Sequence, residues 1–514
     1  MADNSKVFTL RIVTVAVFVI LAIAGVGFSA YLLVVANSPY MYFTAVLFAI
    51  LAVISGFFNL IASTTYYRSY FYNKQFKELS KSVKPLKQYP KVAIAVPTYN
   101  EDPKVVKDTV LRLLRMDYPK NRMKLFLLDD STKKDISSEL RAFSEKIGIR
   151  YIHRSIRSGF KAGALNNFLK YTNAEFITVF DYDEKLKNRR FLKELLPYFQ
   201  DPKVSYVQTE KSYGSGSIFS DSVSLFDKFF FKFIQPARAM NNTAIFAGSC
   251  GIIRASILKK LGGFPEYIIE DTFFSFESDM KDYKSLYIPK VYALGKPIKT
   301  FTELAKQQWR YNYGDTQFIK YFLRYKSRKK NISPFSRIDY ITHGFGLNYL
   351  SVVLLLFTFV SILIVFSAVS FIHITLAQFL KPSFIGLDLE VFGSIAFVMS
   401  FLAPIILTKI YFNSIKKGIM VFALNFALVI VRTKAALAAL FGQKPTVSWS
   451  RPTGKMSGNI IYSLKNTSIE FSIAMLLVGL GTFASLHHNM LGGIWLIWYG
   501  FLYLLATIFL YKYG

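Results

Sequence analysis

The chain is organised around the stretch Ala174-Glu175-Phe176-Ile177-Thr178-Val179-Phe180-Asp181-Tyr182-Asp183. Its first six residues predict a buried strand, and two aspartates follow at the strand's end. Alternate side chains of a strand share a face, so Asp181 and Asp183 can point the same way. Two carboxylates this close repel unless a cation or a shared proton compensates, and a divalent metal that carries phosphates is one solution. Taken alone, the pattern more often marks a solvated acidic turn.

Two further predicted strands also end in polar residues, which favours a ligand site over a solvated turn. Residues 92–97 and 124–128 are apolar, and helices are predicted over 103–116 and 135–147. Strands that alternate with helices indicate an α/β domain with a mostly parallel sheet, whose ligands bind at the carboxyl ends of the strands. The polar residues at the three strand ends are Thr98, Tyr99, Asn100 and Glu101, then Asp129 and Asp130, then Asp181 and Asp183.

Long apolar runs flank this domain and predict a membrane protein. The chain has 514 residues, of which 52% are hydrophobic and 17% aromatic, and this is too apolar for a soluble enzyme of such length. A membrane-spanning helix needs about 20 apolar residues. Six spans are predicted, with both termini in the cytoplasm because basic residues flank the outer ends of the runs. The runs cover 12–36, 40–62, 349–373, 391–411, 470–486 and 491–511.

The predicted organisation has three parts. An N-terminal transmembrane hairpin covers 1–65, a cytoplasmic α/β domain covers 66–335, and a C-terminal membrane region covers 336–514. Within the last part, the apolar run 418–431 is short for a span, so a helix over 415–441 is expected to lie at the interface or to re-enter. If this helix crosses the membrane, the topology of everything after it is reversed.

The net charge of +31 is large. A nucleic-acid binder is one interpretation, but the basic residues follow the membrane flanks, which favours contact with anionic membrane lipid and no nucleic acid. The single cysteine, Cys250, excludes an internal disulfide framework.

Three more clusters carry groups suited to chemistry, and each has a plain structural alternative. Lys161 beside Gly163 can meet a phosphate or simply start a helix with a solvated lysine. The small residues Gly248, Ser249 and Cys250, with the later pair Glu270 and Asp271, can bring an acceptor to a base, or the acidic pair can cap a helix. The third cluster, Gln307-Gln308-Trp309-Arg310-Tyr311, offers a guanidinium for a diphosphate and rings for a sugar, or forms a helix packed on the membrane face.

In their sequence order, these pieces resemble the membrane-embedded family-2 glycosyltransferases, the group that includes cellulose, chitin and hyaluronan synthases. The resemblance covers about 92–313 closely and the flanking spans more loosely. The matching pieces are Pro97-Thr98-Tyr99-Asn100-Glu101, Asp129-Asp130, Lys161-Ala162-Gly163-Ala164-Leu165-Asn166, Asp181-x-Asp183, Gly248-Ser249, Glu270-Asp271 and Gln307-x-x-Arg310.

The resemblance implies a GT-A (Rossmann-like) fold between transmembrane and interface helices, and an inverting transfer from a nucleoside-diphosphate sugar. It implies that Asp130, with Asp129 beside it, holds the nucleotide base, and that Asp181 and Asp183 hold Mg²⁺ or Mn²⁺ on the diphosphate. Lys161 and Arg310 would contact phosphate. The other donor-side residues would be Thr98, Tyr99, Glu101, Gly163, Gln307 and Tyr311.

On the acceptor side, the resemblance implies that Asp271, next to Glu270, is the general base. Gly248, Ser249, Cys250 and Trp309 would line the acceptor path. A gating-like loop is expected over 444–458, with Trp449, Thr453 and Lys455, although its spacing departs from the family's usual one. The residue after Arg310 is Tyr311 where the family has a tryptophan, so the acceptor subsite is expected to differ.

The small membrane region and the expected lack of a regulatory domain after the last span favour a compact enzyme. The predicted function is transfer of a hexose, mannose or glucose, from a UDP- or GDP-sugar to a lipid-linked glycan acceptor of the polyprenyl or dolichyl type, at the cytoplasmic face of the cell membrane. One alternative is a processive polysaccharide synthase that also translocates its polymer. An alternative of another class is a non-enzymatic transporter or channel.

Overall fold

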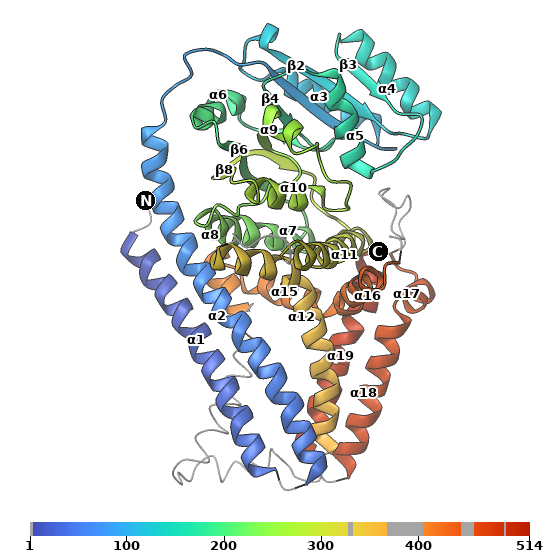
Figure 1. Ribbon diagram of the computed structural model, residues 1–514. Helices are drawn as coiled ribbons and strands as arrows, with labels where there is room; N and C mark the ends of the chain where they lie inside the picture. Colours follow the sequence, from blue (N-terminus) through green and yellow to red (C-terminus); the bar gives the residue numbers. More distant parts are fainter. Residues whose placement is uncertain are drawn as a thin grey trace.

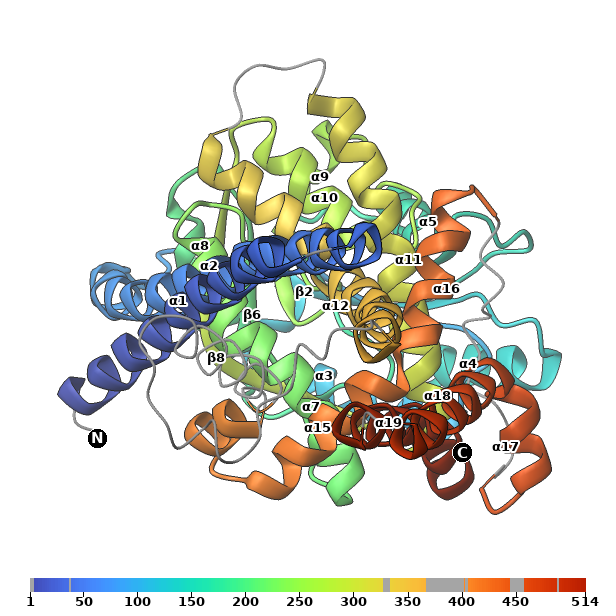
Figure 2. The same cartoon turned by 90° about the horizontal axis from the view of Figure 1, so that it is seen from below.

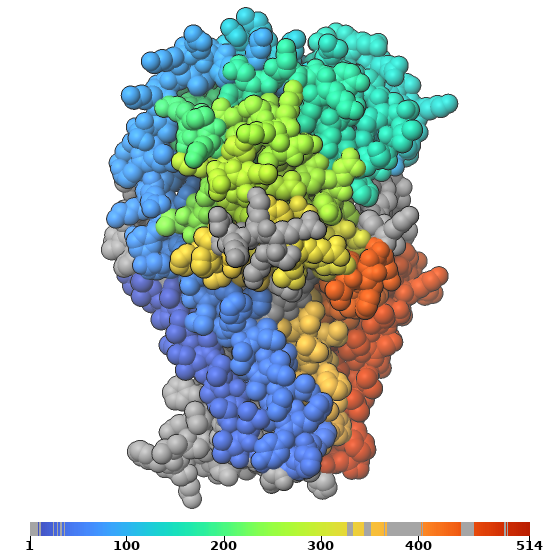
Figure 3. All heavy atoms as spheres, in the orientation of Figure 1, coloured from blue at the N-terminus to red at the C-terminus, as the bar shows by residue number. Residues whose placement is uncertain are grey.

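The computed structural model describes residues 4–36, 38–326, 333–366, 402, 405–443, 457–487 and 490–514. A sheet domain forms one end of the molecule, a bundle of long helices forms the other, and a layer of shorter helices lies between them (Figures 1 and 3). Both chain termini lie at the end of the bundle that faces the sheet domain (Figure 1). The α/β domain and the helical regions on either side of it in the sequence thus occupy different ends of the molecule (Figure 1), and the assignment of those regions to a membrane stays a prediction.

The sheet has eight strands in the order β3-β2-β1-β4-β7-β6-β8-β5. The strands β3, β2, β1 and β4 run parallel, β7 runs antiparallel to both β4 and β6, and β6 and β8 are parallel to each other. The predicted parallel half is confirmed, whereas the other half of the sheet is mixed. The strands are β1 (Val92–Thr98), β2 (Met123–Asp129), β3 (Arg150–His153), β4 (Phe176–Val179), β5 (Lys185–Leu186), β6 (Val204–Tyr213), β7 (Gly251–Arg254) and β8 (Lys284–Gly295).

This topology brings distant segments to one edge of the sheet. Thr98 pairs with Asp129 at the carboxyl ends of β1 and β2, and β4 ends beside β1. Because β7 is antiparallel to β4, the loop that precedes β7 lies at this same edge. The carboxyl end of β6 also lies there, because β6 is antiparallel to β7 in turn. Because β3 is parallel to β2 and β8 is parallel to β6, one edge collects the ends of six strands and the start of β7.

Helices cover both faces of the sheet, and the side chains of β1 show how. Val92, Ile94 and Val96 pack on one face in a core with α3 (Pro103–Leu114), α4 (Lys134–Lys146) and α6 (Phe191–Leu195). Ala93 and Ala95 face the other way, toward α5 (Phe160–Phe168), α9 (Ala255–Lys260) and α10 (Glu270–Asp279). The alternation of strand side chains, together with burial on both faces, explains why this strand is apolar throughout.

The middle layer joins the sheet domain to the bundle. It contains α7 (Ile218–Phe229), a π-helical turn at Phe230–Ile234, α8 (Gln235–Ala239), α11 (Phe301–Lys326), α15 (Ile415–Ala427) and α16 (Val429–Leu440) (Figure 1). The predicted helix over 415–441 is thus a pair of helices that meet at an angle of 44°. Whether this pair crosses a membrane or lies at its surface stays a prediction.

The bundle contains α1 (Asn4–Val35), α2 (Pro39–Ser82), α12 (Pro334–Phe366), α17 (Ile460–Asn466), α18 (Ser468–Leu486) and α19 (Met490–Tyr513). Seen from below, α12 lies between the α1–α2 hairpin and the α18–α19 pair (Figure 2). In the described part of the chain, three helices are long and apolar enough to cross a membrane, Pro39–Ser82, Ser468–Leu486 and Gly492–Tyr513, and the bent pair would make a fourth. The predicted six spans remain a prediction, because most of 391–411 and the end of 349–373 lie outside the described residues.

A buried ion pair fastens the hairpin to the rest of the molecule. Arg68 of α2 binds both carboxylate oxygens of Asp339 of α12, at 2.9 and 3.2 Å. Asn241 and Thr243, which follow α8, donate further hydrogen bonds to the same carboxylate, each at 2.8 Å. The Asp339 side chain is only 2% exposed, so its charge depends on these partners.

We therefore expect Asp339→Asn to lower the thermal unfolding temperature of the detergent-solubilised protein. Loss of one partner of a buried ion pair costs about 3 kcal/mol because it leaves the other charge uncompensated. The matched control is Glu78→Gln, which removes the exposed Lys81–Glu78 pair on the same helix α2 and should leave the unfolding temperature unchanged. Equal unfolding temperatures for the Asp339→Asn variant and the parent would show that this contact does not fasten the hairpin.

Candidate active site

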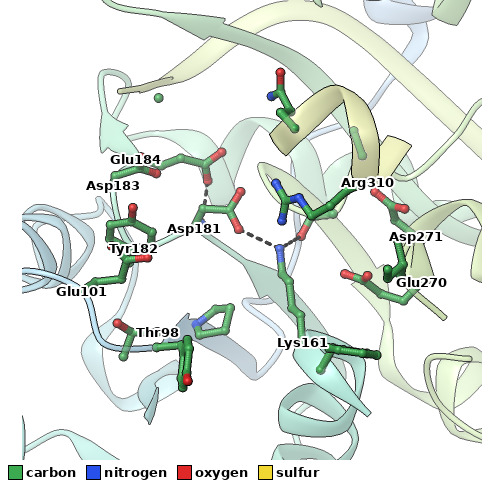
Figure 4. A pocket seen from close by; sticks show the side chains of 18 of the residues that line it. Thr98, Glu101, Lys161, Asp181, Tyr182, Asp183, Glu184, Glu270, Asp271 and Arg310 are labelled. Atoms are coloured by element: carbon green, nitrogen blue, oxygen red, sulfur yellow. Dashed lines mark hydrogen bonds and ion pairs between the residues drawn. The ribbon is translucent and has the colours of Figure 1, made fainter. Parts of the chain in front are cut away.

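A cavity of about 330 Å³ opens at the carboxyl edge of the sheet. Figure 4 shows Asp181 and Asp183 on one side of it and Glu270 and Asp271 on the other, with Lys161 and Arg310 between them. The predicted site residues that line the cavity are Thr98, Tyr99, Glu101, Asp130, Lys161, Asp181, Asp183, Gly248, Glu270, Asp271, Gln307, Arg310 and Tyr311. The structure therefore brings together most of the residues that the sequence singled out.

The ends of β1 and β2 form one wall of the cavity. Arg154 donates two hydrogen bonds to the Asp130 carboxylate, one of them from Nε to Oδ1 at 2.8 Å. The guanidinium of Arg157 lies 3.7 Å from the centre of the Tyr99 ring, close enough for a cation–π contact. This wall thus presents an aromatic ring, a carboxylate and the Arg157 guanidinium to the cavity, with Arg154 behind Asp130.

The centre of the site is Asp181, whose two carboxylate oxygens each meet a lysine. Lys161 Nζ lies 2.6 Å from Oδ1 and also donates to the Gly248 carbonyl at 3.0 Å, and Lys211 Nζ lies 3.3 Å from Oδ2. Burial alone would raise the pKa of Asp181, but the two lysines outweigh it and hold this pKa well below its ordinary value. Asp181 is therefore an anion at any physiological pH.

Asp181 and Asp183 lie past the end of the strand, so strand alternation does not set the positions of their side chains. The strand β4 ends at Val179, and both aspartates lie beyond it in a turn. The turn is closed by Glu184, whose backbone N–H donates to the Asp181 carbonyl at 3.1 Å and whose carboxylate accepts from the Asp181 N–H at 2.9 Å. Both side chains therefore line the cavity because of a turn and not because of strand alternation.

These carboxylates fit a metal ion that arrives with phosphates. Within the described ranges, no group of three or more His, Cys, Asp or Glu side chains is arranged to hold a metal by itself. Mg²⁺ and Mn²⁺ on a diphosphate need only one or two protein carboxylates, because phosphate oxygens and waters supply the remaining ligands. Asp183, with Asp181 beside it, meets that smaller requirement.

Glu270 and Asp271 form the first turn of α10. Glu270 is 5% exposed, and burial, followed by the charge of Asp271, raises its pKa to about 8. Burial also raises the pKa of Asp271, although the Thr272 N–H and Lys161 oppose the shift. A Cβ atom placed on Gly248 would lie 3.1 Å from Asp271 Oδ2, so the absence of a side chain there keeps the space beside this carboxylate open. A carboxylate with a raised pKa in an open cavity suits a general base.

One face of α11 forms the wall nearest the bundle. Glu303, Lys306, Gln307 and Arg310 line the cavity, and their spacing places them on a single helical face. Tyr311 lines it as well, beside Tyr213 from the end of β6. The opposite face of α11, with Gln308 and Asn312, is buried. This segment is therefore both a wall of the cavity and a helix packed against its neighbours, and its position on a membrane face stays a prediction.

Five predicted site residues do not line the cavity. Asp129 is buried and accepts from the Tyr151 hydroxyl at 2.7 Å, and the Cys250 side chain lies in the core. Ser249 is fully buried and accepts from Lys211 at 2.6 Å. A Cβ on Gly163 would lie 2.0 Å from the Ser158 carbonyl, so this glycine serves a close approach within the protein and not to a phosphate. Trp309 stacks on Tyr313 at 4.9 Å.

These five placements correct the corresponding predictions of direct ligand contact and leave the five residues a supporting role. The gating-like loop residues Trp449, Thr453 and Lys455 lie outside the described residues.

Several residues of the site were not predicted. Lys211 lies on β6, and Arg154 and Arg157 lie in the loop before α5. Lys211 lies near the carboxyl end of β6, whose sequence was not recognised as a strand, so a wider search for strand ends could have found it. The two arginines carry no motif, and only the pairing of β2 with β3 places Arg154 beside Asp130.

Comparison with known proteins agrees with this geometry. Residues 93–262 match the family described as Glycosyl transferase family 2. The chain is 31% identical over 241 residues to a cellulose synthase catalytic subunit [UDP-forming] of Pseudomonas fluorescens (strain SBW25), a match that covers 45% of this chain and 32% of that protein. It is 28% identical over 240 residues to cellulose synthase 2 of Novacetimonas hansenii, with 45% of this chain and 15% of that protein covered. The chain thus matches only a third or less of the length of these relatives.

Among solved structures, a mannosyltransferase from Pyrobaculum calidifontis in complex with GDP-Man and Mn²⁺ aligns with 75% of this chain and 99% of its own, at 17% identity and a TM-score of 0.49. An overlap at this level adds no conclusion about this chain. The family match covers the strands that build the cavity, from β1 to β7. It assigns an enzyme family and so does not favour the non-enzymatic transporter. Residues 93–262 of the chain therefore match the family-2 glycosyltransferases, and part of the chain is similar to the catalytic subunits of cellulose synthases.

Proposed function

We propose that the protein moves a hexose from a nucleoside-diphosphate sugar to a hydroxyl group of a lipid-linked acceptor, with inversion at the anomeric carbon. The observation that carries the proposal is the two-sided cavity, which has the Asp271 carboxylate on one side and the cations and aspartates suited to a diphosphate on the other (Figure 4). Inversion in one step requires a base and a leaving group on opposite sides of the reacting carbon.

The donor occupies the wall that runs from β1 to β4. Tyr99 offers a ring for the nucleotide base, Asp130 a carboxylate for its N–H groups, and Glu101 a carboxylate for the ribose hydroxyls. Arg310 reaches the diphosphate from α11, and a guanidinium suits this role because its planar fork can bind two oxygens at once. Lys161, which contacts Asp181 in the structure, would bind the donor's phosphates.

In the proposed chemical step one bond forms, one bond breaks and one proton is transferred. The acceptor hydroxyl oxygen attacks the anomeric carbon and forms the new glycosidic bond, while the bond from that carbon to the diphosphate oxygen breaks. The hydroxyl proton passes to Asp271, and the nucleoside diphosphate leaves with the bonding electron pair. Burial, which raises the pKa of Asp271, makes this carboxylate a better proton acceptor than an exposed one.

A divalent ion, Mg²⁺ or Mn²⁺, would be held by Asp183 and Asp181 together with the diphosphate, and when bound it supplies charge neutralisation for the leaving group. Among the residues of the chain itself, Lys161 and Arg310 contribute positive charge to the same group.

The acceptor is proposed to come from the membrane. The wall formed by α11 belongs to the helix layer that lies on the bundle, so a lipid-borne sugar near the membrane surface could enter beside Tyr213 and Tyr311 (Figure 1). In the proposed orientation the sheet domain and both termini are cytoplasmic, and basic residues of the layer face anionic lipid. Mannose and glucose both remain candidates for the transferred hexose.

A processive polysaccharide synthase is the second candidate, and the cellulose synthase relatives favour it. It would use the same base and the same donor wall, and differ in keeping the product bound for repeated additions.

The base assignment predicts the behaviour of Asp271→Asn. The amide keeps the oxygen that accepts from the Thr272 N–H at 2.8 Å, but it cannot take a proton. We expect transfer to fall by roughly 100- to 10,000-fold, with donor affinity nearly unchanged. Transfer is measured by product formation and donor affinity by calorimetry. The matched control, Asp282→Asn, changes an exposed aspartate just after α10 and should keep full activity. An active Asp271→Asn variant would exclude this residue as the base.

The metal assignment predicts that a chelator abolishes transfer and that added Mg²⁺ or Mn²⁺ restores it. In Asp183→Asn the metal concentration for half-maximal activity should rise about tenfold or more, since each 1.4 kcal/mol of lost binding is about a factor of ten. Asp135→Asn, at the exposed start of α4, is the matched control. Full activity in the presence of a chelator would contradict metal dependence.

Product size separates the two candidate functions. Purified protein is incubated with UDP- and GDP-hexoses and polyprenyl-phosphate-linked acceptors, and the products are measured by mass spectrometry. A mass increase of one or a few hexoses supports the lipid-linked transferase. A series of long chains supports the processive synthase.

A further inference from the structure

Arg432 is a buried cation in the helix layer, with neutral partners. It lies in the first turns of α16, and its side chain is 0% exposed. Its Nε and Nη2 donate to Gln308 Oε1 of α11 at 3.0 and 2.7 Å, and its Nη1 donates to Asn425 Oδ1 of α15 at 3.0 Å. The guanidinium also lies 5.8 Å from the ring of Phe226 of α7. One side chain of α16 thus contacts three other helices of the layer.

Burial of the Arg432 guanidinium costs folding free energy, and this cost points to a role other than stability. A buried guanidinium loses its hydration, and an ion pair with a carboxylate is the usual compensation. In the part of the chain that the structure describes, the three hydrogen bonds of Arg432 all end on uncharged amide oxygens. An apolar side chain of similar size would fill this space at lower cost, but it would not hold Gln308 in one place.

Gln308 is the residue through which Arg432 can affect the site. It lies on α11 directly after Gln307 and two residues before Arg310, both of which line the cavity. Gln308 itself faces away from the cavity and is 3% exposed. The backbone carbonyl of Gln308 accepts a hydrogen bond from Asn312 Nδ2 at 2.7 Å. This bond links Gln308 to the next turn of α11. A fixed Gln308 therefore fixes the rotation of α11 about its own axis.

Two further polar contacts join helices of this layer. Lys417 of α15 pairs with Asp221 of α7 at 2.8 Å. Lys320 of α11 donates to the carbonyls of Ala439 and Leu440 at the end of α16, at 3.2 and 2.9 Å. These contacts hold the ends of the bent helix pair against α7 and α11, whereas Arg432 acts near the bend, beside the residues of the site.

We propose that Arg432 is a positioning residue, which through Gln308 sets the rotation of α11 so that Arg310 and Gln307 face the donor diphosphate. The proposal rests on the proposed function, because the contact of Arg310 with the donor belongs to it. A misplacement of about 1 Å at a binding group is enough to cost a large part of a site's efficiency. The bent pair α15–α16 is thereby coupled to donor binding and not only packed beneath the domain.

The test separates positioning from stability with a paired substitution. Arg432→Met leaves Gln308 without its donor, and Gln308→Leu leaves a buried charge without its acceptor, so each single variant should lower the unfolding temperature. The double variant Arg432→Met/Gln308→Leu removes both polar groups and should regain most of that stability. Lys434→Met, on the exposed side of the same helix, is the matched control and should resemble the parent.

The decisive readout is the affinity for UDP and GDP, measured by calorimetry on monodisperse protein well below each variant's unfolding temperature. We expect binding in the double variant to be about tenfold weaker than in the parent, with the KM for donor raised and the KM for acceptor unchanged, since lost contacts of about 1.4 kcal/mol have that effect. Parental donor affinity in the double variant would overturn the proposal, whatever its stability.

A second comparison distinguishes this inference from the function on which it rests. Arg310→Ala should bind UDP or GDP less tightly than the parent. If the parent binds neither nucleotide, the proposed function fails. If the parent binds and Arg310→Ala binds weakly, while the double variant binds as the parent does, only the positioning role of Arg432 is excluded.

Discussion

The ammonium groups of Lys161 and Lys211 flank the two carboxylate oxygens of Asp181, and this contact joins the parts of the site. Lys161 comes from α5, Lys211 from β6 and Asp181 from the turn after β4, while Ser249 from the loop before β7 lies within hydrogen-bond distance of both Lys211 and Asp181. The edge of the sheet gathers many carboxylates, which would repel one another without these cations. The charge balance at Asp181 therefore allows an acidic edge to form a compact cavity.

The contacts of Lys161 also divide the cavity into two sides, one beside Asp181 and one beside Asp271. Lys161 reaches from Asp181 toward the Gly248 carbonyl, and the missing side chain of Gly248 keeps the space beside Asp271 open. The proposed phosphate side and the proposed base side thus share one lysine, and Arg310 of α11 lines the cavity between them (Figure 4). Since α11 also contacts the bent helix pair, the proposed chemistry of the sheet domain would be coupled to this pair.

Local sequence pattern predicted the strands β1, β2 and β4, and most of the site residues that it singled out line the cavity, because strand ends and short acidic or basic motifs are contiguous in the chain. It failed where contacts depend on topology. The antiparallel β7 brings Lys211 to Asp181, and nothing near residue 211 signals that partner. Ser249 matched a motif of small residues, yet its hydroxyl is buried under the site. Arg432 meets Gln308 across 124 residues, so no local pattern could reveal the pair.

The stereochemistry of the product tests the two-sided cavity most directly. A nucleoside-diphosphate sugar with an α-linked hexose is supplied, and the anomeric configuration of the transferred sugar in the product is determined by NMR. With Asp271 opposite the leaving diphosphate, the account predicts a β-linked product. An α-linked product would contradict the in-line arrangement, because retention requires two displacements or attack from the side of the leaving group.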